Sequence, residues 1–321
     1  MSENTHISRR YWLHAVTPIH LGSGRGLGYI DLPVAREAVT KWPYLPGSSV
    51  KGVIAGRARA EMRDKDDAGA KRRLVWAFGP EKVDEDNGTA GSLVFTDAHI
   101  LCLPVRSFFG TFAWVTSPFA LTRFVRDGGL QEELAETVKE LAVSSQSAIV
   151  TPESVLTENG AGDKIYLEDL DLTVCKTNDK VKLLAHRIAK AVFAGDSEWQ
   201  AEFVKRFAVI SDDIFSFLCE TGTEVNAHIR IDDKTGVVRK GALWYEETLP
   251  GETILSGMVW CEKVYVAKKN SEEKNVPTPK ALLDAYCVNN DHLQIGGKAS
   301  TGKGIVRLVY ESAEEGKADA C

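Results

Sequence analysis

Apolar residues predict strands in both halves of the chain. Alternating β-branched and aromatic side chains over 8–21 predict a strand that is interrupted near Thr17-Pro18. Similar runs predict strands over 92–101, 253–267 and 305–312. Strands therefore lie at both ends of the sequence and also within it.

Helices are predicted between these strands. An apolar side chain recurs every four residues from Val50 to Met62, which predicts a helix, and Ser48 or Ser49 is its expected N-cap. Further helices are predicted over 130–142, 182–195, 211–220 and 280–287. We therefore expect the segment 126–207 to be mainly helical. Because strands flank the helices without regular βα repetition, the predicted fold class is α+β.

Residues 222–245 predict a β-hairpin. Two β-prone arms surround the turn-forming sequence DDKTG, which is typical of a hairpin tip.

Composition narrows the class of protein. The 321 residues are 44% hydrophobic and 26% charged, as in a soluble globular protein. No apolar run reaches the roughly 18–20 residues of a membrane span, and the N-terminus has no apolar signal segment, so we expect no membrane partner and a cytoplasmic location. The six cysteines and seven histidines form no CxxC or HExxH spacing, which excludes zinc-ribbon, redox and zinc-protease motifs.

Charge is distributed unevenly along the chain. The net charge is −6, yet residues 1–73 carry 13 Lys and Arg against 7 Asp and Glu. The segment 293–310 is also basic. The ends of the chain could therefore face a polyanion, although solvated surfaces are the simpler explanation of the pattern.

Two glycine-rich loops resemble nucleotide-binding motifs without matching them. GSGRGLG (22–28) lacks the GxGxxG spacing and the helix that follows it in a dinucleotide site. GKASTGKG (297–304) has Gly304 where a P-loop needs Ser or Thr. Its backbone N–H groups, hydroxyls and lysines can still hold a phosphate oxygen, and a tight strand connection is the alternative reading.

Four motifs in order identify a family resemblance. These are HLGSG (20–24), DLPVARE (31–37), PGSSVKG (46–52) and GGKASTGKG (296–304). Together they resemble the RAMP proteins of CRISPR effector complexes, most closely the backbone subunit of the type III-B (Cmr) complex. The resemblance spans essentially all of 1–321 as a single RAMP domain. It implies an RRM-like (ferredoxin-like) palm, helical insertions and a thumb, for which the hairpin 222–250 is our candidate.

The resemblance also implies the chemistry. Such subunits form a filament on guide RNA with other CRISPR effector subunits, and cleave bound single-stranded target RNA at regular intervals with a divalent metal ion, expected to be Mg²⁺. Asp31 matches the essential aspartate, as a proton acceptor or an indirect metal ligand. His20 is a second-tier catalytic residue with an equally good packing role. Glu37 is the nearest other acid, and we expect it to pair with Arg36 or a surface lysine.

Basic and glycine-rich positions are the expected RNA contacts. Lys51 and the two serines on the first helical turn can hold a phosphate, and capping by the serines is compatible with this role. The full predicted set is Ser48, Ser49, Lys51, Arg57, Gly296, Gly297, Lys298, Ser300, Thr301, Gly302, Lys303, Arg230 and Arg239.

Two alternatives stay open. The chain could be the equivalent subunit of a type III-A complex, or a structural guide-RNA-binding subunit without nuclease activity. Asp31 distinguishes a nuclease from the structural subunit, because a subunit that only binds RNA has no chemical need for this aspartate.

Overall fold

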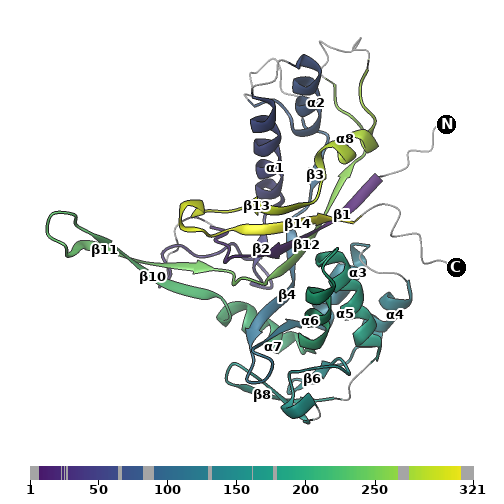
Figure 1. Cartoon of the computed structure of the whole chain (residues 1–321), viewed down its shortest axis with the longest axis vertical. Coiled ribbons are helices and arrows are strands. Elements are labelled where there is room, and N and C mark those ends of the chain that lie inside the picture. Colours follow the sequence, from purple (N-terminus) through teal and green to yellow (C-terminus); the bar gives the residue numbers. More distant parts are fainter. Residues whose placement is uncertain are drawn as a thin grey trace.

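A computed structural model shows a long mixed sheet with helices on both faces and a separate two-stranded hairpin (Figure 1). This arrangement confirms the predicted α+β class. The structure describes residues 7–311 except 23, 25, 27, 64–66, 82–89, 129–131, 161, 176–178 and 267–274. None of the described helices is both long and apolar enough to cross a membrane.

The strands of the sheet come from distant parts of the sequence. They follow the order β13-β14-β1-β12-β4-β5-β9-β6-β8-β7, with β2 paired to β4 and β3 to β12. The bounds are β1 (Ile7–Ala15), β2 (Tyr44–Leu45), β3 (Val94–Phe95), β4 (Ala98–Arg106), β5 (Phe112–Thr116), β6 (Ser147–Val150), β7 (Lys164–Leu167), β8 (Leu170–Val174), β9 (Phe207–Ile210), β12 (Ile254–Cys261), β13 (Asn290–Gln294) and β14 (Ile305–Tyr310).

Helices cover the two faces of this sheet. Figure 1 places α1, α2 and α8 at one end of the molecule and α3 to α6 at the other. The bounds are α1 (Gly47–Met62), α2 (Ala68–Phe78), α3 (Pro118–Arg126), α4 (Glu132–Glu140), α5 (Asp179–Val192), α6 (Ser197–Arg206), α7 (Asp212–Thr221) and α8 (Pro279–Tyr286), with short 3₁₀ turns at Glu158–Gly160 and Ala299–Thr301.

Strand β1 lies between β12 and β14, and helices packed on both faces of the sheet bury its residues from Arg10 to Ala15. Tyr11 and Leu13 pack into one core with α1, α2 and α8, whereas Trp12 packs into a second core with α3, α5 and α6. The apolar positions of α1 face the first core, where Val50 and Ile54 are buried. The four-residue spacing thus found the buried side of this helix correctly.

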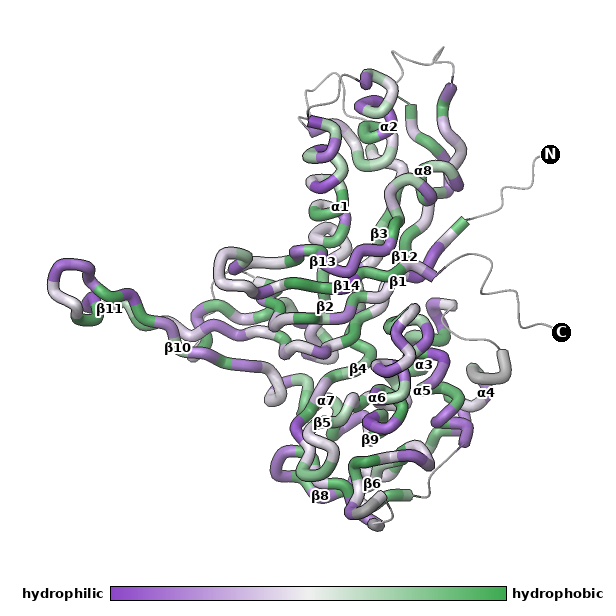
Figure 2. The backbone as a smooth tube through the Cα atoms, viewed as in Figure 1, coloured by the Kyte–Doolittle hydropathy of each residue, from purple (hydrophilic) through white to green (hydrophobic). Residues whose placement is uncertain are grey.

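The predicted hairpin is present and projects from the body (Figure 1). Strands β10 (Glu224–Ile231) and β11 (Val238–Thr248) pair only with each other as a sheet, and residues 232–237 form the tip. Its arms carry hydrophobic as well as hydrophilic residues into solvent (Figure 2), including the half-exposed Ile229 and Leu243. Little of the hairpin beyond its base is therefore held by the core.

The structure corrects three local predictions. Neither Ser48 nor Ser49 caps α1: the helix begins at Gly47, whose N–H donates to Asp97 Oδ1 at 2.8 Å. Asp97 lies in the turn that divides the strand predicted over 92–101 into β3 and β4. The strand predicted over 253–267 ends at Cys261.

The segment 126–207 is more mixed than the predicted helical insertion. Among its described residues, strands β6, β7 and β8 accompany helices α4, α5 and α6. These strands are short and extend the long sheet, so their apolar residues did not stand out between the helical patterns.

Candidate active site at the hairpin base

Three segments that are far apart in sequence meet at the base of the hairpin. The loop after β1 pairs with β11, since Leu32 N–H donates to the Tyr245 carbonyl and Glu247 N–H donates to the Leu32 carbonyl. The C-terminal glycine-rich loop joins them, because Gly297 N–H donates to the His20 carbonyl at 3.0 Å. Most of the four sequence motifs therefore converge on one place.

Asp31 lies exposed at this junction. Its Oδ2 accepts a hydrogen bond from Tyr245 N–H at 2.8 Å, and its carbonyl accepts one from Gly26 N–H. Its Oδ1 has no partner among the described residues. The side chain is thus fixed by one oxygen and presents the other for chemistry.

A cleft of about 430 Å³ lies beside Asp31. Lys298 and Trp244 also line it, and the Lys298 ammonium lies 5.9 Å from the centre of the Trp244 ring. Leu243 and Gly241 complete the wall on the hairpin side. A carboxylate and an ammonium therefore line one cleft, an arrangement that suits proton transfer and charge stabilisation at a phosphate.

His20 does not line this cleft. Its ring is buried, and Nδ1–H donates to the Glu247 carbonyl at 2.8 Å. Because a carbonyl only accepts, Nδ1 carries the proton in this arrangement. The contact fits a packing role for His20, and its catalytic role stays a prediction.

Glu246 is a buried carboxylate that the sequence interpretation missed. Lys298 Nζ and Lys303 Nζ lie 2.9 and 3.2 Å from its oxygens. Burial would raise the pKa of Glu246, but the two ammonium groups outweigh it and hold the pKa below its ordinary value. The two lysines predicted to bind RNA therefore already share one negative charge, which reduces what they offer to a phosphate.

Glu247 connects the hairpin to the Asp31 loop. Its buried carboxylate accepts from Val34 N–H at 2.9 Å, from Thr223 Oγ1 at 2.8 Å and from the Arg36 guanidinium. The sequence did carry a signal for this connection. Two adjacent acids, Glu246 and Glu247, stand at the end of a β-prone arm, and carboxylates that become buried need hydrogen-bond or ionic partners.

The C-terminal loop adopts the backbone that its glycines permit. Gly296 has φ +87°, and a Cβ there would lie 2.5 Å from the His20 carbonyl oxygen. Lys298 is left-handed with φ +66°, and the Thr301 hydroxyl donates to its carbonyl at 2.8 Å. Gly297, Ser300, Thr301 and Gly302 are exposed around Lys298. The loop thus packs one side on His20 and leaves the other accessible.

The remaining predicted RNA contacts lie elsewhere. Lys51 is half-buried on α1 with no ion-pair partner among the described residues, and burial lowers its pKa. Arg57 pairs with Glu61 at 2.9 Å.

On the hairpin, Arg230 is exposed and Arg239 Nε lies 3.3 Å from Asp232. Ser48 is exposed and Ser49 half-buried at the start of α1. None of these six residues lines the Asp31 cleft.

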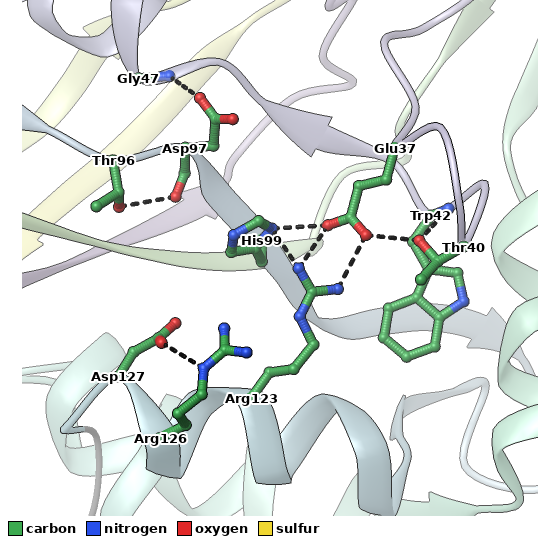
Figure 3. Close-up of polar contacts among 10 residues, drawn as sticks. All are labelled: Glu37, Thr40, Trp42, Gly47, Thr96, Asp97, His99, Arg123, Arg126 and Asp127. Atoms are coloured by element: carbon green, nitrogen blue, oxygen red, sulfur yellow. Dashed lines mark hydrogen bonds and ion pairs between the residues drawn. The ribbon is translucent and has the colours of Figure 1, made fainter.

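Glu37 does not line the Asp31 cleft and is bound in a polar cluster with Arg123, His99 and Thr40 (Figure 3). The Arg123 guanidinium binds both of its oxygens, and His99 Nδ1 and Thr40 Oγ1 add hydrogen bonds at 2.7 and 2.6 Å. Burial opposes ionisation, but these three partners together hold its pKa well below the ordinary range. The expected pairing with Arg36 or a surface lysine is wrong, since Arg36 binds Glu247 and Glu37 binds Arg123.

The described residues offer no ready-made metal centre. No three His, Cys, Asp or Glu side chains among them gather as an ion's ligands. At the cleft, Asp31 supplies one uncommitted carboxylate oxygen. A site formed by protein alone does not fit, whereas Mg²⁺ is commonly held by one carboxylate together with substrate phosphates and water.

Comparison with known proteins establishes the class. The sequence model of the RAMP superfamily matches residues 12–307, so the chain belongs to that superfamily. This confirms the resemblance drawn from the four motifs.

Individual relatives are named for the Cmr system. The chain is 34% identical over 308 residues to the CRISPR system Cmr endoribonuclease Cmr4 of Pyrococcus furiosus, covering 93% of this chain and 94% of that protein. The crystal structure of oligomeric Cmr4 from Pyrococcus furiosus has a TM-score of 0.67 at 26% identity, covering 95% and 97% of the two chains. A chain of the type III-B Cmr-beta complex bound to cognate target RNA shares the fold, with a TM-score of 0.70 at 21% identity and coverage of 95% and 97%.

Proposed function

We propose that this chain is the RNA-cleaving backbone subunit of a type III-B CRISPR effector complex, with Asp31 as its catalytic carboxylate. The observation that carries the proposal is Asp31 itself. One oxygen is anchored to the hairpin and the other is available in a cleft that also contains Lys298. The Cmr endoribonuclease from Pyrococcus furiosus, similar over nearly its whole length, supports RNA as the substrate.

The cleavage step follows from these two groups. Asp31 accepts the proton of a ribose 2′-OH, and the resulting oxygen attacks the adjacent phosphorus. The O2′–P bond forms while the P–O5′ bond breaks, leaving a 2′,3′-cyclic phosphate, and O5′ takes a proton from water. Lys298 lines the same cleft, and the charge that its pairing with Glu246 leaves would stabilise the additional negative charge on the phosphoryl oxygens.

The same proposal assigns the architecture. The order β14-β1-β12-β4, with α1 after β1 and α8 after β12, supports a ferredoxin-like palm, since that fold has strand order 4-1-3-2 with a helix after its first and third strands. The projecting hairpin within 222–250 supports a thumb. We assign 1–321 to one RAMP domain and 126–207 to an insertion.

The proposed partners are guide RNA, target RNA, further copies of this chain and other CRISPR effector subunits. The oligomeric state and the target-RNA complex named for similar structures support this choice. The type III-A subunit and a structural scaffold stay as alternatives, and loss of cleavage on changing Asp31 separates the nuclease from the scaffold.

Magnesium dependence is a further part of the proposal. Removing Mg²⁺ with EDTA should lower the cleavage rate by about 10²-fold or more, because an ion bound to phosphate oxygens, and to Asp31 only through water, would contribute several kcal/mol to such a reaction. The measurement is cleavage of a labelled target with and without added Mg²⁺. Full activity in EDTA, with guide binding intact, would remove the metal from the proposal.

Guide binding should depend on phosphate contacts and fall with salt. Lys51→Ala should weaken binding about equally for unrelated guides and reduce the slope of log K against log salt by about 0.7–0.9. Lys51 gives a cleaner test than Lys303, whose loss would also leave Glu246 with one partner fewer. Lys180→Ala, at a surface ion pair with Glu140, is the control. A loss that differs among guide sequences would contradict backbone recognition.

The hairpin tip should be dispensable for folding and necessary for regular cleavage. Replacing 232–237 by a two-residue Asn-Gly turn removes exposed residues and the partly buried Asp232, whose contacts lie within the hairpin, so the melting temperature of the chain should change little. The target should then be cut less, and without even spacing. Products of unchanged spacing and abundance would show that this hairpin is not the thumb.

A further inference from the structure

A second surface feature lies away from the Asp31 cleft. A groove of about 550 Å³ runs between α1 and α2, at the end of the molecule remote from α3 to α6 (Figure 1). Ala60 and Gly56 form its α1 wall, and Val75, 40% exposed, lies on its α2 wall. Arg59 and Arg63 stand along its edge.

Neither of the two arginines has a counter-ion among the residues that the structure describes. No side-chain hydrogen bond or ion pair joins Arg59 or Arg63 to a described residue, and Arg63 is exposed. Like charges four residues apart on a helix destabilise it by about 0.2–0.5 kcal/mol. On another side of the same helix, Arg57 is matched by Glu61 at that spacing. The described lining adds Lys71 and a single acid, Glu81, so the groove is basic overall.

The wall between these charges is open and aliphatic. A Cβ on Gly56 would meet nothing within 4 Å, so nothing described in this chain requires glycine there. Glycine inside a helix nevertheless costs about 0.5–1 kcal/mol relative to alanine. The described lining contains no aromatic side chain on which a base could stack. These features suit a close approach by another apolar surface better than by a nucleic acid.

We propose that this groove binds an acidic amphipathic segment of a partner protein. Apolar side chains of that segment pack against Ala60 and Val75, and its acids pair with Arg59 and Arg63. Charge complementarity selects the partner, because arginines that no described acid neutralises, beside an apolar wall, favour a segment that is acidic along one edge. This interaction is separate from RNA cleavage and does not use the hairpin base.

Photo-crosslinking identifies the occupant. Benzoylphenylalanine is placed at position 75 in the complex purified from its native cells, and at exposed Val16 as the control. The expected product is a peptide from another protein with several Asp or Glu residues beside apolar ones. A crosslink to RNA, a peptide without acidic character, or no yield above the control would overturn the proposal.

Charge and shape variants test the same surface. Arg59→Glu with Arg63→Glu should weaken association with the crosslinked partner by about tenfold or more, and leave guide RNA binding unchanged. The matched control, Arg106→Glu with Arg126→Glu, makes the same charge change at well-exposed positions and should have no effect. Equal loss in both double variants would contradict a specific groove.

Gly56→Leu separates docking from folding. It fills open space and improves helix propensity, so the melting temperature of the isolated chain should stay the same or rise. Association with the partner should fall about tenfold because the leucine occupies the approach path. Unchanged association would show that nothing packs closely against this helix, and would overturn the proposal while leaving the nuclease assignment intact.

Discussion

Asp31→Ala should abolish target cleavage while guide binding and assembly survive. Losing a positioned proton acceptor costs on the order of 10²–10⁴-fold in rate. The exposed side chain fills no core, and removing a negative charge beside RNA leaves affinity unchanged or slightly higher. The measurement is cleavage of a complementary target by the reconstituted complex with Mg²⁺, beside a binding assay.

Asp31→Asn is the matched control for geometry. The amide oxygen can still accept from Tyr245 N–H, so the loop stays attached to the hairpin, but the neutral side chain cannot take the proton. Both variants should therefore be inactive, with Asn the better folded. Full cleavage by either would refute the catalytic assignment, and lost assembly in both would make Asp31 a structural residue.

Glu247→Ala should be the most destabilising single change at the hairpin base. It leaves Arg36 without its carboxylate and removes the acceptor of Val34 N–H and Thr223, and breaking a buried ion pair in this way costs about 3–5 kcal/mol. Urea denaturation of the isolated chain measures the free energy of unfolding.

Glu220→Ala provides the comparison for this change. Glu220 is exposed on α7, so its removal should alter stability by about 0.5 kcal/mol or less. If the two variants were equally stable, Glu247 would not connect the hairpin to the Asp31 loop.

Local sequence patterns were sufficient to predict several features of the fold and of the candidate site. The spacing of Val50 and Ile54 located the buried side of α1, and β-prone arms around a turn located the hairpin. Ordered glycine motifs singled out the Asp31 loop and the Lys298 loop, which the fold brings to one cleft. Each of these depends on residues close in sequence or on a family resemblance.

Contacts between residues that are far apart in sequence could not be predicted from local patterns. Asp97, from the link between β3 and β4, replaces the expected serine cap of α1. Glu246 meets Lys298 and Lys303 only because β11 returns beside the C-terminal loop. Glu37 finds Arg123 rather than its neighbour Arg36, since successive residues in an extended segment point to opposite sides.

The hydrogen bond from Tyr245 N–H to Asp31 has a geometric consequence for the proposed nuclease. It makes the projecting arm and the reactive carboxylate parts of one rigid unit, so their separation is fixed within each subunit. The distance between successive cuts must then be set by how copies repeat along the guide. Each subunit would then contribute one cut per repeat. Changing a contact between copies, rather than the loop around Asp31, would change the spacing between successive cuts.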